Sequence, residues 1–346
     1  MSVADDFRAG KPLPLPTIKI PAQDDRPRKE VLLDVYRHKD IGYVPNLFWD
    51  YNFLRSRYIN EHPIPSDADY SGGDWFGCEW KYNADEDSSA PAPGARLPIS
   101  DMTEWHRQVT FPDLDAYDWE KIAAEETKNF DRKKKISMVM LESGIFERSH
   151  LLAGFEKVMV AMYEEPEAYE GLLDAITEHR LKLIDIVGRY YKPDVLMHHD
   201  DFGHQTGMMM SLDMWRMFFK PRLQKLVDRC HSHGMFYEQH SCGYITPLIP
   251  EFVEIGVDAI NDLQPMNDLE AIKRDYGKQI TLCGGFDTRV LDDRGASKKA
   301  IRAEVRRTYD ALAPGGSYVS MPIVLDYGNC TVPILLEHRK IARSYR

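Results

Sequence analysis

The sequence predicts an α/β protein that folds as a (β/α)8 TIM barrel with an irregular N-terminal extension. From about residue 135 onward, short apolar runs alternate with amphipathic helical stretches across short connections. Such alternation requires parallel strands joined by helical crossovers. Five or more of these units follow one another without interruption, which favours a closed barrel over an open sheet. No G-x-G-x-x-G fingerprint of dinucleotide binding follows a strand.

The individual elements follow from their residue patterns. Strands are expected where β-branched and apolar residues cluster between polar ends, and helices where apolar residues recur every three or four positions. Ser211 and Gly234, which flank one helical stretch, are residue types that begin and end helices. The expected strands are 136–143, 194–201, 235–242, 258–264, 280–287 and 318–324. The expected helices are 151–191 with an interruption at Pro166, 211–234, 246–256, 268–277, 297–316 and 332–346.

Residues 1–130 have a different character from the rest of the chain. Proline and aspartate interrupt short aromatic runs, a strand is indicated only at Trp75–Tyr82, and Asp85–Gly94 resembles a loop. No break in composition marks this region as an independently folded unit. We therefore expect residues 1–130 to be an extension of the same domain that covers the barrel mouth. Residues 131–346 would then form the main body of the barrel.

Composition and charge exclude several classes of function. The chain has 346 residues, 43% of them hydrophobic, and a formal net charge of −11. This balance argues against nucleic acid or an anionic membrane as the partner, since phosphate binding requires clustered Lys and Arg. The N-terminus lacks a signal-peptide pattern, and no apolar run reaches the roughly 20 residues that span a bilayer. The five cysteines are an odd number, so reduced thiols and a cytoplasmic protein are expected.

Polar residues gather where the expected strands end. In a β/α barrel the carboxyl ends of the strands build the active site, so residues far apart in sequence converge on one mouth. The adjacent His198 and His199 should face opposite ways, so at most one of them looks into the barrel. The residues at these strand ends are His198, His199, Asp200 and Asp201; Glu238, His240 and Cys242; Asn261, Asp262 and Gln264; and Cys283 and Asp287.

The stretch "YEQHSCGYITP" contains a candidate metal pair. His240 and Cys242 are separated by one residue, so in a strand both point to the same face. Imidazole nitrogen and thiolate are preferred Zn²⁺ ligands, and a catalytic zinc site has three protein ligands and one open position. We predict Cys283 as the third ligand, with Cys330 and Asp262 as alternatives. A buried cysteine that only packs is the simpler interpretation of such a pair, and Cys230 in a helix is expected to do no more than that.

Longer motifs resemble the uroporphyrinogen decarboxylase-like superfamily. They are "HHDDFGHQTGMMMSLDMWRMFFKPRLQKLVDRCHSHG" followed by "EQHSCGYITPLIPEFVEIGVDAINDLQP". The likeness extends from about Gly144 to the C-terminus and includes an Asp-Asp pair, an H-x-C-G strand end and a G-V-D-x-I-N segment. The superfamily joins the decarboxylase, corrinoid-protein methyltransferases and relatives of cobalamin-independent methionine synthase. Its fold is a (β/α)8 barrel, as the alternation of elements also predicts.

The resemblance implies a zinc-dependent methyltransferase that moves a methyl group from a small donor, such as an aryl methyl ether, to a corrinoid protein. In that branch the H-x-C pair and a later cysteine bind zinc, and His240 and Cys242 match the first two positions. The segment "MPIVLDYGN" lacks the later cysteine at its expected place, a departure from the coenzyme M methyltransferases. The resemblance also suggests a homodimer. The alternatives are a zinc-dependent thiol alkyltransferase without corrinoid, and a non-catalytic binding barrel.

A metal-free decarboxylase of the uroporphyrinogen type is a further alternative. It requires an R-Q-A-G-R-like basic segment to hold the substrate carboxylates, whereas only Arg55 and Arg57 occur near the corresponding place. The expected mouth is acidic, which would repel a porphyrinogen that carries many carboxylates.

The hypothetical mechanism assigns roles to the remaining polar and aromatic residues. Asp200, Asp201 and Glu238 would orient the groups around the zinc, while Tyr237 and His204 are candidate proton donors. We expect an aromatic lid, formed by Trp49, Tyr51, Trp75 and Trp80, over the donor. The predicted substrate-binding residues are Trp49, Trp75, His204, Gln205, Asp262, Gln264 and Asp287.

Overall fold

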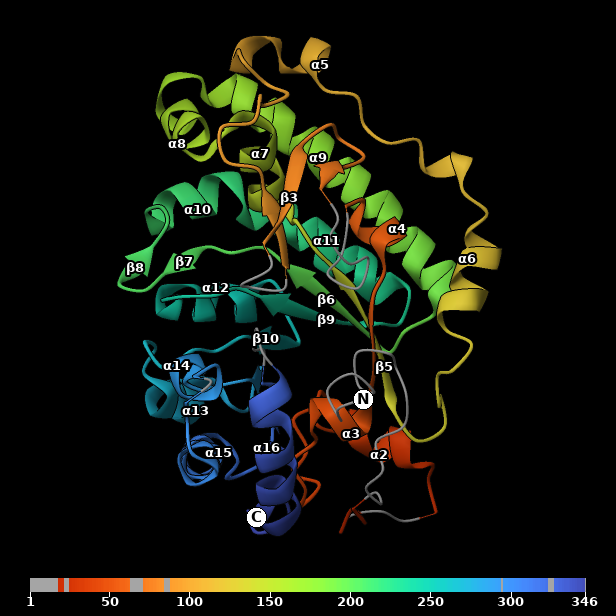
Figure 1. The fold of residues 1–346 in the computed structure, drawn as a ribbon, viewed down its shortest axis with the longest axis vertical. Helices are drawn as coiled ribbons and strands as arrows, with labels where there is room; N and C mark the ends of the chain where they lie inside the picture. The colour runs from red at the N-terminus through yellow and green to blue at the C-terminus, as the bar shows by residue number, and fades with distance from the viewer. Residues whose placement is uncertain are drawn as a thin grey trace.

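A parallel sheet of seven strands forms the centre of the molecule (Figure 1). The computed structural model describes residues 18–21, 25–62, 71–83, 88–293, 295–322 and 327–345. The strand order is β1-β5-β6-β9-β10-β11-β12, and every pair is parallel. The strands are β1 Tyr51–Arg55, β5 Ile136–Leu141, β6 Val195–His199, β9 Phe236–His240, β10 Ala259–Asn261, β11 Thr281–Cys283 and β12 Tyr318–Val319. The predicted α/β class with parallel strands is therefore confirmed.

Helices connect successive strands as expected for βαβ units. In Figure 1, α9 and α11 lie side by side and run along the strands β6 and β9. The connecting helices are α7 Ile145–Ala153, α8 Phe155–Glu164, α9 Pro166–Ile186, α10 Leu212–Phe218, α11 Lys220–Ser232, α12 Ile249–Glu254, α13 Leu269–Tyr276, α14 Thr288–Leu291 and α15 Lys298–Leu312. The C-terminal helix α16 spans Tyr327–Ile341. None of the helices in the described part of the chain is long and apolar enough to cross a bilayer.

Two long helices of the sequence prediction are broken in the structure. The stretch 211–234 becomes α10 and α11, since Pro221 lies in the first turn of α11, where its missing N–H is tolerated. Ser211 caps α10 as expected, and its hydroxyl accepts the N–H of Met214 at 3.2 Å. The stretch 151–191 is divided at Gly154, whose φ is 91°, and again at Pro166.

The predicted N-terminal extension contributes a strand to the central sheet. Strand β1 pairs in parallel with β5, so the sheet begins well before residue 131. The sequence concealed this strand because its five residues include the polar Asn52 and Arg55. The other elements before residue 130 are α2 Arg28–Leu33, α3 Leu47–Asp50, α4 Arg57–Asn60, β2 Gly72–Gly73, β3 Glu79–Asn83, β4 Ser88–Pro91, η2 Met102–Glu104, α5 Trp105–Gln108, η3 Leu114–Ala116 and α6 Trp119–Glu126.

A single parallel bridge connects the two ends of the described sheet. Asn46, which precedes β1, pairs with Ser320, which follows β12. The N–H of Leu47 donates to the carbonyl of Ser320 at 3.0 Å, and the N–H of Ser320 donates to the carbonyl of Pro45 at 2.8 Å. The sheet is therefore curled, while a fully closed eight-stranded barrel stays a prediction.

The extension reaches both ends of the sheet rather than the mouth alone. At the amino ends of the strands, Lys29 pairs with Asp194 at 2.8 Å, and the ring of Tyr36 stacks on Phe236 with centroids 5.3 Å apart. Figure 1 shows α2 and α3 in the lower part of the view, beside α16. The division at residue 130 stays a prediction. Residues 29–38, which were expected to cover the barrel mouth, lie instead at the amino ends of the strands.

Buried ion pairs hold the later part of the extension over the carboxyl ends. Asp74 accepts a hydrogen bond from Arg148 of α7 at 2.8 Å, and both side chains are fully buried. Glu61 binds Arg180 and His179 of α9, at 2.9 and 2.7 Å. These pairs fix Glu61 and the segment around Asp74 against the helices that follow β5.

Asp74→Asn is expected to lower the free energy of unfolding by about 3–5 kcal/mol, because it leaves the Arg148 guanidinium buried without a counter-charge. The control is Glu104→Gln, which breaks the surface pair with Arg107, whose side chains are 44% and 75% exposed. The control should change stability by less than about 0.5 kcal/mol. Urea unfolding measures both variants, and equal losses would contradict the assignment of Asp74 as an anchor.

Candidate functional site

The pairing of β6 with β9 brings two histidine rings together. The register places His199 opposite His240, and their rings stack with centroids 4.2 Å apart and an interplanar angle of 12°. Neighbouring side chains on a strand face opposite sides, so His198 points away from them and its Nδ1 lies 3.3 Å from Gln239. Only one of the adjacent histidines therefore contributes to this face.

The loops after β6 and β9 add a carboxylate and a thiol to the two rings. Oδ1 of Asp201 accepts the N–H of Cys242 at 2.7 Å and lies 3.7 Å from Nε2 of His240. The Cys242 Sγ atom is 3.5 Å from the same Nε2. Ligand atoms of His199, Asp201 and His240 all lie within 4.8 Å of one another. The predicted pair His240 and Cys242 thus lies beside two residues from β6 and its following loop.

Hydrogen bonds hold each imidazole by its Nδ1 atom. Nδ1 of His240 is 2.5 Å from Oδ1 of Asn261 on β10. An amide oxygen only accepts, so the His240 Nδ1 must carry the proton and Nε2 keeps its lone pair. Nδ1 of His199 lies 2.9 Å from Oε2 of Glu147 on α7. Outer partners of this kind orient metal-binding histidines in proteins.

Burial and neighbouring charges shift the pKa values of the group. Burial, and then the charge of His199, lowers the pKa of His240 to about 4. Burial alone would also lower the pKa of His199, but the carboxylates of Glu147 and Asp201 outweigh it and raise this pKa to about 10. Burial, together with Asp201, raises the pKa of the Cys242 thiol well above its ordinary value. His240 is therefore a neutral nitrogen donor, while the thiol keeps its proton unless a cation displaces it.

These residues fit a Zn²⁺ ion. The group offers imidazole nitrogens, a carboxylate and a thiol, which are the ligand types that zinc binds in proteins. The free lone pair of His240 already points toward Cys242 and Asp201. An imidazole held in this tautomer needs no rearrangement to bind a cation.

Asp200 binds the start of α7, next to the residues that surround His240. Its carboxylate accepts the N–H groups of Phe146 at 3.0 Å and Glu147 at 2.9 Å, so it binds the first turn of α7. Burial, followed by the Glu147 charge, raises its pKa to about 8. Gly144 makes this contact feasible, because a Cβ there would lie 2.5 Å from Asp200. Asp200 thereby positions Glu147, and its predicted catalytic role stays a prediction.

Glu238 and Cys283 lie together in a separate buried cluster. Oε2 of Glu238 accepts the hydroxyl of Tyr36 at 2.8 Å and faces the Sγ of Cys283 at 3.7 Å. Tyr36 in turn lies 3.1 Å from the hydroxyl of Tyr51. Burial raises the pKa of Glu238 to about 7, against the effect of the hydrogen bonds from Tyr36 and Cys283. The structure does not bring Cys283 into the group of His199, Asp201 and His240.

Tyr237 faces away from the candidate site. Its hydroxyl donates to Gln239 at 3.2 Å on the side of β9 that faces the helices, and its ring lies beside His198 with centroids 5.8 Å apart. This is the alternation of a strand in which Glu238 and His240 point the other way. The position of Tyr237 gives no support to its predicted role as a proton donor.

The predicted substrate-binding residues are dispersed. Asp262 is buried, burial raises its pKa to about 8, and its Oδ1 has no hydrogen-bond partner among the described residues. Gln264 accepts the N–H of Gly243 at 2.8 Å, and Asp287 caps α14 and pairs with Arg289. His204 and Gln205 are exposed around the hairpin of β7 Gly203–His204 and β8 Gly207–Met208. Trp49 is buried against His338 of α16, and Trp75 is half-buried and donates its backbone N–H to the backbone carbonyl of Glu61. Their binding roles stay predictions.

Sequence reasoning assigned no role to three residues at the site, His199, Glu147 and Asn261. Asn261 occupies the strand register of His240 on the neighbouring strand, a relation that appears only once β9 and β10 are paired. Glu147 lies on a helix, so its distance from His199 depends on how α7 packs. For His199, alternation along β6 was the available signal, but it could not tell which of the two histidines faces inward.

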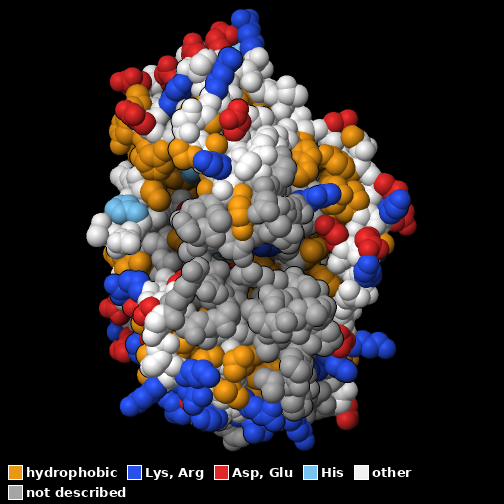
Figure 2. All heavy atoms as spheres, in the orientation of Figure 1, with side chains coloured by type: hydrophobic (Ala, Val, Ile, Leu, Met, Phe, Trp, Pro, Cys, Tyr) orange, Lys and Arg blue, Asp and Glu red, His pale blue; other side chains and the backbone are white. Residues whose placement is uncertain are grey.

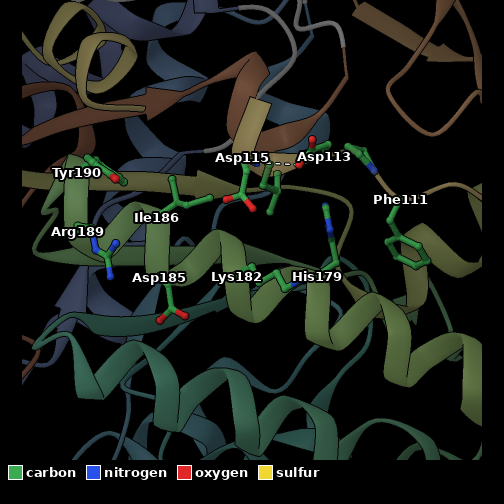
Figure 3. Close-up of a pocket in the computed structure, with 11 residues that line it drawn as sticks. Phe111, Asp113, Asp115, His179, Lys182, Asp185, Ile186, Arg189 and Tyr190 are labelled. Carbon is green, nitrogen blue, oxygen red and sulfur yellow. Dashed lines mark hydrogen bonds between the residues drawn. The ribbon is translucent and has the colours of Figure 1, made fainter. Parts of the chain in front are cut away.

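A separate hollow of about 500 Å³ lies on the outer side of α9 (Figure 3). The segment 111–115 forms one wall, and side chains of α9 and the turn after it, including Lys182 and Arg189, form the other. His179 on this wall is the residue that pairs with Glu61. The predicted site residues do not line the hollow, so its position gives no support to them.

Comparisons with known proteins agree with the fold. The family model described as Uroporphyrinogen decarboxylase (URO-D) matches residues 133–322, more than half of the chain. The methyltransferase from Methanosarcina mazei superposes with a TM-score of 0.64 at 15% sequence identity, and the match covers 92% of this chain and 99% of that chain. This likeness shows a shared fold.

Two further comparisons add nothing to the assignment of function. A structure described as a "putative fructose-1,6-biphosphate aldolase from Coccidioides immitis" matches at 9% identity over 92% of this chain and 93% of that one, with a TM-score of only 0.32. The search of curated proteins gave no match.

Glu238→Gln is expected to change how stability depends on pH. In the folded protein the pKa of Glu238 is about 7, above its unfolded value of roughly 4.3. Between these values the folded state binds the extra proton, so the Glu238 contribution to stability falls as the pH rises. Gln does not titrate and lacks this loss. The free energy of unfolding of the variant, relative to wild type, should therefore rise by about 1–3 kcal/mol as the pH is raised from about 4.5 to 8. Chemical denaturation with a chelator present measures this, and parallel curves for the two proteins would contradict it.

Proposed function

The chain belongs to the uroporphyrinogen decarboxylase (URO-D) family, and on this premise we propose that it is a zinc-dependent methyltransferase. The proposed reaction moves a methyl group from a small donor, such as an aryl methyl ether, to a reduced corrinoid carried by a separate protein. The structural likeness to a protein named as a methyltransferase is consistent with this proposal, although at 15% identity it supports the fold alone.

The observation that carries the proposal is the state of His240. Its Nδ1–H donates to Asn261, so the Nε2 lone pair is free and lies 3.5 Å from the Cys242 thiol. His240 and Cys242 would hold the Zn²⁺ ion, with a third ligand beside them. When bound, zinc would supply Lewis-acid polarisation of the oxygen that leaves the methyl group.

The residues of this chain would hold the metal ligands in place and supply a proton to the leaving oxygen. The acceptor provides the electron pair for the new bond to carbon, the C–O bond breaks, and the oxygen keeps its electrons and takes up a proton. Asp262, whose pKa is about 8, is a neutral acid near pH 7 and is the proposed source of that proton. Glu147 and Asn261 would keep the imidazoles in place throughout.

An exposed apolar surface supports the docking of a partner protein. Figure 2 shows hydrophobic side chains that gather over α8 and α10. Phe155, Tyr163 and Met217 are 47%, 71% and 56% exposed. These helices belong to the connections that follow the carboxyl ends of β5 and β6, the strands next to the candidate site. Contiguous exposed apolar groups often mark interaction surfaces, and we propose this face for the corrinoid protein.

Ion pairing argues against a decarboxylase of polyanionic porphyrinogens. Such a substrate requires several arginines available for carboxylates. Near the carboxyl ends, Arg55 pairs with Glu142, while Arg148 and Arg180 are buried in pairs with Asp74 and Glu61. The chain's own carboxylates already neutralise these three guanidinium groups.

A methyl-transfer assay tests the function directly. Wild-type protein, loaded with Zn²⁺ and supplied with aryl methyl ethers, should bleach the absorption of a reduced corrinoid protein as that corrinoid becomes methylated. Cys242→Ser should lower the rate by at least about 100-fold, by loss of a metal ligand. Cys230→Ala, which changes a buried thiol on α11, should retain the rate. Release of CO₂ from a porphyrinogen by metal-free protein, without methyl transfer, would refute the proposal.

The role of Asn261 is tested by two substitutions of similar size. Asn261→Leu removes the acceptor for the His240 N–H and should weaken Zn²⁺ binding by about 10- to 100-fold. Asn261→Asp keeps an acceptor in the same place and should bind Zn²⁺ at least as tightly as wild type. Competition with a chromophoric chelator measures both affinities. Equal affinities for the two variants would show that the hydrogen bond does not prepare His240 for a metal.

A further inference from the structure

The sequence predicts Cys283 as the third ligand of the proposed zinc site, with Cys330 and Asp262 as alternatives. The structure brings a different residue, Asp201, to the two donors of β9. Its Oδ1 atom lies 3.7 Å from Nε2 of His240, which is itself 3.5 Å from the Sγ of Cys242. A carboxylate oxygen and a sulfur therefore both lie within 4 Å of Nε2 of His240.

These separations match those around a tetrahedral zinc ion. With Zn–N and Zn–O near 2.0–2.1 Å and Zn–S near 2.3 Å, neighbouring ligand atoms lie roughly 3.3–3.6 Å apart. The nitrogen–sulfur distance agrees with this, and the nitrogen–oxygen distance is longer by a few tenths of an ångström.

The fold holds Asp201 in this position. The backbone N–H of Cys242 donates to its Oδ1 at 2.7 Å, so the carboxylate is tied to the same loop that carries the thiol. The parallel pairing of β6 with β9 sets the two loops side by side. A residue positioned by both strands is a better ligand than one that a flexible loop would have to deliver.

The sequence candidate on β11 is engaged elsewhere. The Cys283 thiol donates to Oε2 of Glu238 at 3.7 Å, and Glu238 lies two residues before His240 on β9. Its neighbour Tyr36 occupies the other side of that carboxylate. Cys283 therefore has a packing and hydrogen-bonding role that requires no cation.

We propose that Asp201 is the third protein ligand of the metal site, so that zinc is held by one imidazole, one thiolate and one carboxylate. This proposal rests on the function proposed above and narrows it. Three protein ligands leave one position open, and a ring nitrogen of His199 lies within 4.8 Å of the donor atoms of Asp201 and His240. Replacement of a thiolate by a carboxylate makes the metal harder, which suits an oxygen-bound methyl donor better than a thiol.

The number of thiolates on the metal tests the proposal without any activity assay. Wild-type protein loaded with Co²⁺ should show the charge-transfer absorption of a single thiolate, and Cys242→Ser should abolish it. Cys283→Ser and Cys330→Ser should leave the spectrum and the Zn²⁺ affinity unchanged within about threefold. Absorption of two thiolates in the wild type would overturn the proposal. Loss of charge-transfer absorption in Cys283→Ser or Cys330→Ser would overturn it as well.

Substitutions of Asp201 provide the second test. Asp201→Asn should weaken Zn²⁺ binding by at least about 100-fold, more than the loss of an outer partner. Asp201→Cys should restore tight binding and double the charge-transfer absorption of the Co²⁺ protein. Circular dichroism checks that each variant folds, and the wild-type spectrum decides the case if one does not. Unchanged affinity in a folded Asp201→Asn would refute the ligand assignment alone, whereas a wild type that binds neither ion would refute the proposed function as well.

Discussion

The parallel pairing of β6 with β9 is the constraint on which the candidate site depends. One register places His199 opposite His240, and the loops that follow then place Asp201 against the backbone of Cys242. A slip of one residue would turn every side chain of one strand to the other face. A slip of β6 would turn His199 away from His240 and put His198 in its place. The chemistry of the site is thus a consequence of strand register.

Buried polar contacts at the two ends of the sheet keep that register in place. At the carboxyl ends, Asp74 and Glu61 are anchored to α7 and α9 through Arg148 and Arg180. At the amino ends, Tyr36 reaches into the interior to bind Glu238. Such charges are costly to bury alone but stable once paired, so each pair also selects one arrangement of the surrounding chain.

Two observations support the proposed methyl transfer over decarboxylation of a porphyrinogen. The arginines Arg55, Arg148 and Arg180 are neutralised by the chain's own carboxylates, so they are poorly suited to a polyanionic substrate. In addition, Asn261 holds His240 as a neutral nitrogen donor beside the thiol of Cys242, an arrangement suited to binding a cation. The ion pairs and the hydrogen bond of Asn261 join residues far apart in the sequence, whereas His240 and Cys242 are two positions apart.

The sequence by itself determined the α/β class and predicted the proximity of His240 and Cys242. Alternating strands and helices after residue 135 indicated a parallel α/β sheet, and the i, i+2 spacing of His240 and Cys242 predicted that they lie together, although β9 ends at His240 and Cys242 lies in the loop that follows. These are local properties, because the period of a strand or helix is written in consecutive residues. The tertiary structure decided the rest: that Tyr51–Arg55 is the first strand, that Asn261 holds His240, and that Asp201 rather than Cys283 approaches the pair. Those relations join residues that are tens of positions apart, and only the packing of one strand against the next sets the distance between them.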